Sequence, residues 1–182
     1  INIAKKQKIS SLAMTDYLNI FGAVKFYNNC IDANIKPIIG CEVPLIIENS
    51  RIDNIVLLCQ NIDGYFNLNK ILSNIHKSRS SHLGATLELI DEYNSNLICL
   101  SGGRNGVCGL NTLNDTSGAT QLTIESISKI FSDRFYIEID RTNRNNENEY
   151  NNIALTIAKK NELPLVATND VLFINDSDYE AN

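Results

Sequence analysis

The chain has 182 residues, of which 43% are hydrophobic and 20% charged, with 9 glycines and 3 prolines. This length corresponds to one domain of ordinary size, and the composition is typical of folded globular domains. Disordered, collagen-like and low-complexity classes are therefore excluded. The apolar runs are interrupted within a few positions, far short of the roughly 20 residues that a membrane-spanning helix needs, so we expect no membrane segment.

The 16 basic and 21 acidic residues give a net charge of −5. This balance excludes a protein that binds nucleic acid through a broad basic surface of its own. The local basic cluster Lys5, Lys6 and Lys8 allows two interpretations. It contacts a DNA backbone in a larger assembly, or it is a solvated helix face, which is the interpretation we favour.

Five cysteines occur without a CxxC pair, and most of them are embedded in apolar segments. We interpret them as reduced, buried thiols of a cytosolic protein rather than as disulfides or zinc ligands. They are Cys30, Cys41, Cys59, Cys99 and Cys108. The chain opens at Ile1 with neither a start methionine nor a signal peptide, and we expect it to be a piece of a longer protein.

Short apolar runs alternate with amphipathic stretches, which is typical of an α/β fold whose parallel strands are joined by crossover helices. The predicted strands span residues 11–15, 35–43, 54–59, 97–100, 135–139 and 165–168. A closed barrel is favoured over an open sheet, although periodicity alone does not separate the two.

Four helices are predicted between these strands. The first has Asn19 as its N-cap and ends at Asn34, and the second lies between residues 63 and 77. A polar turn is expected at 143–148. The apolar faces of the first, third and fourth helices carry Ala23, Phe26, Tyr27 and Cys30; Ile124, Ile127, Ile130 and Phe131; and Tyr150, Ile153, Ala154, Ile157 and Ala158.

Polar residues follow several of the predicted strands. In parallel α/β folds the loops at the carboxyl ends of the strands converge, and active sites form there. We therefore expect a site at this end of the barrel. The polar strand ends are Thr15–Asp16, Gly40–Glu42, Ser101–Gly103, Asp140–Thr142 and Thr168–Asp170.

Three carboxylates at strand ends, Asp16, Glu42 and Asp170, could hold divalent metals or share acid and base roles. The simpler interpretation is that each caps the helix that follows it. The two histidines give little support to a metal site, because His76 is expected on a solvated helix face and His82 in a loop.

Three blocks of sequence, in the same order, resemble the PHP (polymerase and histidinol phosphatase) domain of bacterial replicative DNA polymerase III alpha subunits. They are MTDYLNIFGAVKFYNNCIDANIKPIIGCEV (14–43), ICLSGGRNG (98–106) and LPLVATNDVLFINDSDYEAN (163–182). The resemblance implies a PHP domain over residues 1–182 with a distorted (β/α)7 TIM-like barrel. It also implies that the N-terminal strand is missing from this fragment and that polymerase domains follow it.

Metal-binding members of the family provide a set of ligands against which this sequence is compared. Their TDH motif is Thr15-Asp16-Tyr17 here, so Tyr17 replaces a histidine, whereas the GCE motif is kept and retains Glu42. Gly103 stands at the position where those members have a cysteine that binds the metal. The vestigial positions are Asp16, Tyr17, Glu42, Gly103, Asp170 and Leu172, of which Glu42 and Asp170 are the retained metal ligands.

Too few nitrogen and sulfur donors remain for a tight metal cluster, so we expect no metal bound to this fragment and assign it no catalytic residue. Asp176-Ser177-Asp178 has the spacing of a polymerase metal pair, but it precedes a predicted helix start and is interpreted as a cap. Nucleotidyl transfer, with its Mg²⁺, is expected in later domains.

The resemblance implies a bacterial, cytoplasmic protein whose full-length form is a DNA-directed DNA polymerase. It further implies that this domain is a scaffold that docks the proofreading exonuclease subunit. The expected partners also include other replicase subunits, and DNA through the full-length protein. Two alternatives stay open. One is an active metal-dependent phosphoesterase or 3′–5′ exonuclease of the PHP type, and the other is a stand-alone enzyme similar to histidinol phosphatase.

Overall fold

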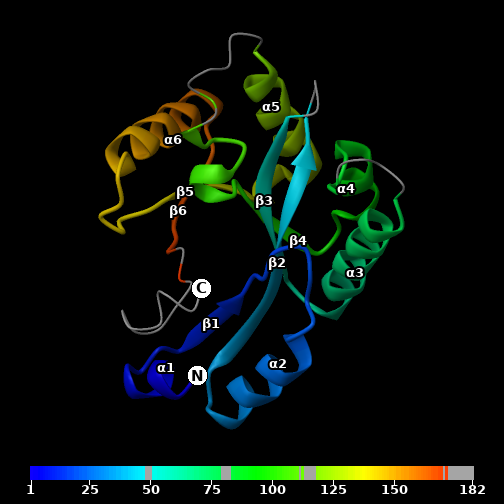
Figure 1. Cartoon of the computed structure of the whole chain (residues 1–182), viewed down its shortest axis with the longest axis vertical. Coiled ribbons are helices and arrows are strands. Elements are labelled where there is room, and N and C mark those ends of the chain that lie inside the picture. The colour runs from blue at the N-terminus through cyan, green and yellow to red at the C-terminus, as the bar shows by residue number, and fades with distance from the viewer. Residues whose placement is uncertain (48–50, 79–82, 111, 113–117, 170, 172–182) are drawn as a thin grey trace.

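The computed structural model describes residues 1–47, 51–78, 83–110, 112, 118–169 and 171, which form helices packed around one curled sheet (Figure 1). The strands are β1 (Ser11–Met14), β2 (Lys36–Ile46), β3 (Ile52–Cys59), β4 (Leu97–Leu100), β5 (Phe135–Ile139) and β6 (Leu165–Ala167). The α-helices are α1 (Asn2–Lys6), α2 (Ala23–Asp32), α3 (Ile62–Lys77), α4 (Leu87–Tyr93), α5 (Ala119–Phe131) and α6 (Glu147–Asn161).

The six described strands form one sheet in the order β1-β2-β3-β4-β5-β6. The sheet curls into half of a barrel, with α3, α4, α5 and α6 on its outer side (Figure 1). The predicted α/β fold of the TIM-like barrel type is thus confirmed. No helix among the described residues is long and apolar enough to cross a membrane.

The prediction that all strands are parallel was wrong for one of them. β3 pairs antiparallel with both β2 and β4, whereas the other neighbouring pairs are parallel. The reason is the short connection between Ile47 and Arg51, whose backbones are joined by a 2.7 Å hydrogen bond. A parallel crossover needs a dozen or more residues. A connection this short can only return the chain as an antiparallel strand.

Strand β2 is longer than predicted and joins β1 to β3. It pairs with β1 from Lys36 to Ile39 and with β3 from Gly40 to Ile46. Gly40 to Glu42 was predicted to end the strand, and instead it lies in the middle of β2, at the point where the partner changes. The expected polar strand end is therefore a change of pairing partner within one strand.

Helix α2 begins later than predicted and has a different cap. Gly22 is its N-cap, and Asn19 instead accepts a hydrogen bond from the backbone of Phe21 at 3.2 Å, in a turn that precedes the helix. The predicted end is confirmed by Asn34, whose φ of 57° lies in the left-handed region. Tyr27 was predicted on the buried face, but its side chain is 50% exposed.

The later helices follow the predicted apolar stripes and start at polar caps where caps are present. Asn61 caps α3 through the backbone N–H of Gly64, at 3.0 Å. Helix α4, which the sequence analysis missed, is capped by Thr86. Helix α6 starts at Glu147, inside the predicted polar turn.

These helices and β2–β5 enclose the main core, and a second, small core of Ala4, Cys30 and Ile35 lies under α1 and α2.

We predict that Gly40→Ala destabilises the fold. A methyl group on Gly40 would stand 2.6 Å from the carbonyl oxygen of Leu57 and 2.6 Å from a methyl carbon of Leu58, so the β2–β3 pair would have to separate. We expect a loss of roughly 2 kcal/mol or more in the free energy of unfolding, measured by urea denaturation. Gly22→Ala is the control, because its new methyl meets the side-chain sulfur of Met14 at 3.3 Å and a carboxylate oxygen of Asp16 at 3.9 Å, and no backbone atom. Equal losses in the two variants would contradict this account.

Candidate functional site

The segment after β1 lies directly beside the middle of β2. The carbonyl oxygen of Asp16 accepts hydrogen bonds from the backbone N–H of Glu42 and from the thiol of Cys41, both at 3.1 Å. Leu18 in turn donates its N–H to the Glu42 carbonyl at 2.9 Å. The structure thus brings Asp16, Tyr17 and Glu42 together through their backbones, while the Tyr17 side chain is 52% exposed.

Glu42 is half-buried, and a neighbouring amide holds its carboxylate. Its Oε1 accepts a hydrogen bond from the side-chain Nδ2 of Asn54, on β3, at 2.6 Å. Because Glu42 lies where β2 has just joined β3, the same change of pairing that lengthens the strand also places this carboxylate next to Asn54. The retained glutamate of the GCE motif is therefore oriented by the sheet itself.

A second carboxylate, which the sequence analysis did not single out, faces the same region from β5. Glu138 is only 6% exposed, and its Oε2 accepts hydrogen bonds from the backbone N–H groups of Gly102 at 2.5 Å and Gly103 at 2.9 Å. The side chain of Thr168 also hydrogen-bonds it. The two glycines have φ values of 81° and 61°, a left-handed conformation that lets both N–H groups converge on one anion.

The backbone of Glu138 is held as firmly as its side chain. Its N–H donates to the buried hydroxyl of Ser101 at 2.9 Å, and its carbonyl accepts a hydrogen bond from the hydroxyl of Tyr150 at 2.5 Å. Tyr150 is fully buried on α6. Glu138 therefore joins β5 to the loop after β4, to helix α6 and, through Thr168, to the residues that follow β6.

The environment of Glu138 raises its pKa above the ordinary value of 4.5. Burial is the main cause, and the nearby negative charge of Glu42 acts in the same direction. The hydrogen bonds from Thr168, Gly102 and Gly103 oppose these two effects by favouring the ionised form. Glu42 is thus close enough for its charge to act on Glu138, which the backbone N–H groups of Gly102 and Gly103 hold.

A sequence signal for Glu138 existed. It lies between Ile137 and Ile139 in a strand whose odd-numbered residues were predicted to share one face, so alternation puts Glu138 on the opposite face. In a curled sheet with helices outside, that opposite face lines the barrel interior. An acidic side chain there is unusual enough to have marked a candidate site residue.

The remaining predicted site residues are only partly described. Asp140 is buried, and its backbone is joined to Asn151 on α6 by hydrogen bonds at 3.1 and 2.7 Å. Asp170, Leu172, His82 and the pair Asp176 and Asp178 lie outside the described residues. The predicted approach of Asp170 to Glu42 therefore stays a prediction.

His76 has a contact that its predicted role as a solvated residue did not include. Although exposed at the end of α3, its Nε2 lies 3.0 Å from the carbonyl oxygen of Leu18. This contact links α3 to the loop that carries Asp16 and Tyr17. His76 thus supports the position of that loop instead of contributing a ligand.

The described residues do not fit a metal cluster. Within the described ranges, no group of three or more His, Cys, Asp or Glu side chains is arranged to hold an ion. Gly103 has no side chain, and its N–H is already bound to Glu138. Burial raises the pKa of Cys41 and of Cys108 to about 12, so both thiols are protonated at neutral pH.

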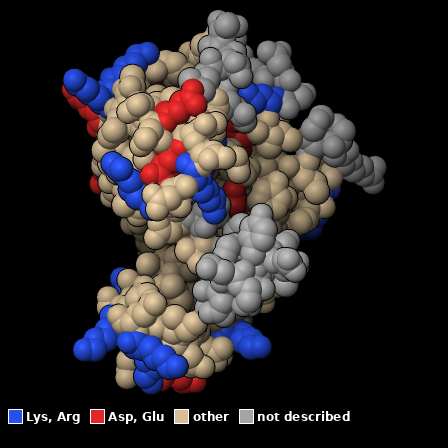
Figure 2. Space-filling model, turned by 60° about the vertical axis from the view of Figure 1, so that its left-hand side comes forward, with Lys and Arg blue, Asp and Glu red and all other residues tan. Residues whose placement is uncertain are grey.

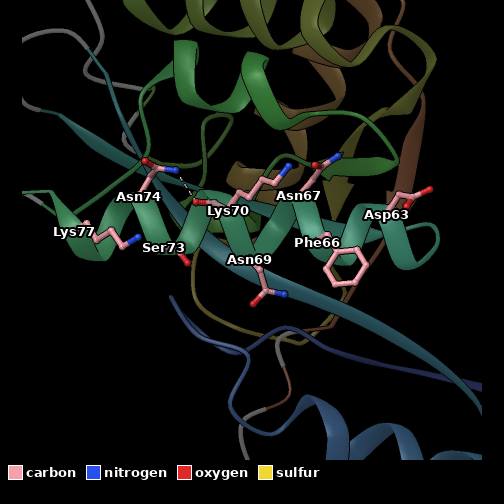
Figure 3. Close-up of a pocket in the computed structure, with 8 residues that line it drawn as sticks. All are labelled: Asp63, Phe66, Asn67, Asn69, Lys70, Ser73, Asn74 and Lys77. Carbon is pink, nitrogen blue, oxygen red and sulfur yellow. Dashed lines mark hydrogen bonds between the residues drawn. The ribbon is translucent and has the colours of Figure 1, made fainter.

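A separate hollow of about 650 Å³ runs along the outer surface of α3 (Figure 3). It is lined by polar side chains such as Asn67, Asn69 and Asn74, which donate to backbone carbonyl oxygens at 2.9 Å. These hydrogen bonds fix the orientation of the three amides along the helix.

The sequence model of the PHP domain matches residues 1–142, so the chain belongs to the PHP domain family. Two solved structures share this fold. A protein described as a metal-dependent phosphoesterase from Bifidobacterium adolescentis has a TM-score of 0.59 at 11% identity, covering 93% of this chain and 80% of its own. An amidohydrolase from Chromobacterium violaceum has a TM-score of 0.55 at 12% identity, covering 93% of this chain and 79% of its own.

Within that family, the chain is similar to DNA polymerase III subunit alpha. It is 34% identical to the protein of Buchnera aphidicola over 182 residues and 37% identical to that of Escherichia coli over 179 residues. These matches cover 97% and 94% of this chain but only 16% and 15% of the relatives. The predicted resemblance is confirmed, and the chain spans about one-sixth of the length of these relatives.

We predict that Glu138→Gln makes stability less sensitive to pH. Because the folded-state pKa of Glu138 is raised, its contribution to stability is complete below the unfolded value of about 4.5 and is lost as pH rises through the folded pKa. The glutamine variant lacks this titration, so its free energy of unfolding should fall less steeply than that of the native chain over this window. Urea denaturation at a series of pH values measures the difference.

Glu88→Gln is the comparison variant, because the pKa of Glu88 is lowered by its own backbone N–H and by the hydroxyl of Thr86. Its contribution is present above the unfolded pKa and lost as pH falls through the folded one, so the sign is reversed. Parallel pH profiles for the native chain and Glu138→Gln would contradict the role given to Glu138.

Proposed function

We propose that residues 1–182 form the PHP domain of a bacterial replicative polymerase of the DNA polymerase III alpha type. The full-length protein performs DNA-templated DNA synthesis with Mg²⁺ in the cytoplasm. Within it, this domain is a metal-depleted scaffold that docks the proofreading exonuclease subunit. The PHP family match and the polymerase relatives support the first part. The pairing of β6 with β5 supports a domain that extends beyond residue 142.

The observation that supports the scaffold role is the hydrogen bonding of the backbone N–H groups of Gly102 and Gly103. The resemblance puts a ligand thiol at residue 103 in metal-binding relatives, and here the glycine N–H groups bind the Glu138 carboxylate. A carboxylate of the protein itself thus occupies the donors at this position. The φ of 61° at Gly103 also disfavours a cysteine there, because a side chain is strained in that conformation.

The alternative is an active metal-dependent phosphoesterase or 3′–5′ exonuclease. One observation favours it, namely that the negative charge of Glu42 acts on Glu138, so two carboxylates belong to one region of the domain. Carboxylates alone bind Mg²⁺ or Mn²⁺ weakly unless further ligands complete the coordination shell. We therefore place this function second.

Metal content separates the two functions. We expect the full-length protein, after incubation with Mn²⁺ or Zn²⁺ and desalting, to retain far less than one equivalent at this domain, measured by elemental analysis. We also expect Glu42→Ala to leave both the metal content and any phosphoesterase activity unchanged. Glu88→Ala, on the exposed surface of α4, is the matched control. Stoichiometric metal together with hydrolysis, both lost only in Glu42→Ala, would establish the alternative.

Docking of the exonuclease subunit is tested on the full-length polymerase subunit. We expect the proofreading subunit to form a stable complex with it and to slow amide hydrogen exchange within residues 1–182, as measured by mass spectrometry. The physical reason is that buried interface amides open to solvent less often. A replicase subunit that binds elsewhere serves as the control. A complex whose protection lies entirely outside this domain would remove the scaffold role.

A further inference from the structure

Helix α1 and the turn after it carry a group of exposed lysines. Lys5 and Lys6 lie in the last turn of α1, and Lys8 follows two residues later. The structure adds a fourth exposed lysine, because the backbone N–H of Lys36, at the start of β2, donates to the carbonyl oxygen of Ser10 at 2.8 Å. We call Lys5, Lys6, Lys8 and Lys36 the lysine patch.

The charge of the lysine patch is opposite to that of the whole chain. Residues 1–11 contain no aspartate or glutamate, although the chain has a net charge of −5. The nearest acidic residue along the chain is Asp32, at the end of α2, and one aspartate against four lysines leaves +3. Among the residues that the structure describes, no salt bridge engages any of the four lysines. Figure 2 shows Lys and Arg side chains gathered over the lower part of the molecule, where Figure 1 places α1 and α2.

Lys8 has a backbone conformation that favours glycine. Its φ is 58°, in the left-handed region, and its N–H donates to the carbonyl oxygen of Lys5 at 3.1 Å. The N–H of Ile9 donates to the carbonyl oxygen of Ala4 at 2.9 Å, which completes the end of α1. Helices that end in this way usually have glycine or asparagine at this position. A lysine there keeps its charge in spite of an unfavourable backbone conformation, and such an outlier points to a use for the charge.

The composition of the patch favours a polyanion over a protein or a membrane. Protein interfaces are depleted in lysine and depend on a central apolar or aromatic cluster. Residues 1–11 offer only Ile3 and Ile9 as exposed apolar side chains, at 40% and 38%. A membrane surface binds an amphipathic helix with a wide apolar face, and α1 has only five residues. Lysine heads are flexible point charges that meet phosphates without a fixed geometry.

Among nucleic acids, the patch fits a duplex better than a single strand. Proteins that hold single strands combine basic residues with aromatic side chains on which the bases stack. Residues 1–11 contain no aromatic residue. Lysine contacts to the phosphates of a duplex need no aromatic partner, and they carry no sequence information.

We propose that the lysine patch binds the phosphate backbone of double-stranded DNA, without sequence preference, when this domain is part of the full-length protein. The inference rests on the proposed function, in which the whole protein acts on DNA. Because the chain as a whole is acidic, the patch adds a contact to a duplex that the rest of the protein already holds.

Acetylation of lysines in the full-length protein maps this contact. We expect a saturating DNA duplex of random sequence to slow acetylation of the lysine patch by an N-hydroxysuccinimide ester about fivefold or more at low salt, measured by mass spectrometry. Three exposed lysines near the ends of α5 and α6, Lys129, Lys159 and Lys160, are the internal control. Their rates of acetylation should not change.

Removal of charge tests the same contact through affinity. In the full-length protein, Lys5→Gln combined with Lys6→Gln and Lys8→Gln should weaken duplex binding about tenfold or more at low salt. The slope of log affinity against log salt concentration should fall by about 2 to 3, because three phosphate contacts are lost. The control protein has glutamine at the three control lysines, an equal change in net charge, and should bind as the native protein does.

Lys8→Gly separates a functional role from a structural one. Glycine tolerates the positive φ, so we expect the midpoint of urea denaturation to rise. Duplex binding should nevertheless weaken about twofold or more, because one phosphate contact is lost. If the charge of Lys8 served only to stabilise the end of α1, the variant would bind DNA normally, and the proposal would be wrong for this residue.

Other results would overturn the proposal as a whole. A protein that binds and extends DNA while the acetylation of the patch stays unchanged keeps the proposed function and loses this inference, whereas a full-length protein that binds no DNA loses both. Equal protection by single-stranded DNA removes the preference for a duplex. Protection by vesicles of anionic lipid but not by DNA assigns the patch to a membrane. Slow acetylation without DNA shows that the protein's own chain covers the patch.

Discussion

The close approach of β2 and β3 at Gly40 is the constraint on which the arrangement of the molecule depends. At this residue β2 leaves β1 and begins to pair with β3, and the space that a side chain would fill is taken by the backbone of Leu57. One strand therefore pairs with both of its neighbours, each over a different part of its length. It holds the small core under α1 and α2 to the main core, and it also sets Glu42 beside Asn54.

The same region explains how a PHP barrel is kept without a described metal cluster. In a metal site, a cation would neutralise the carboxylates and fix the loops at the ends of the strands. Here hydrogen bonds join the loops. Glu138 binds the amides of Gly102 and Gly103, Tyr150 binds the backbone of Glu138, and Asn151 binds that of Asp140. The amide donors offset part of the cost of burying the Glu138 charge, but burial has the larger effect and the pKa of Glu138 stays above its ordinary value.

The two ends of the sheet differ in packing. The main core is continuous from β2 to α6, whereas α2 is held by a small core and keeps an apolar stripe of Val24, Tyr27 and Ile31 toward solvent. Glu42 and Glu138 lie on β2 and β5, which border the main core, so these carboxylates and the apolar stripe of α2 belong to different parts of the domain.

Much of the fold was determined by the sequence alone, because local patterns are sufficient for it. The apolar stripes of α5 and α6, the strand of Phe135–Ile139 and the end of α2 at Asn34 each follow from periodicity or from a residue that tolerates positive φ. The PHP family was also readable, since its motifs are contiguous. Tertiary structure alone decided the pairing of β3 with β4, the exposure of Tyr27 and the partner of Gly103. Each of these depends on which distant segment lies alongside, and the carboxylate that meets Gly103 stands 35 residues further along the chain.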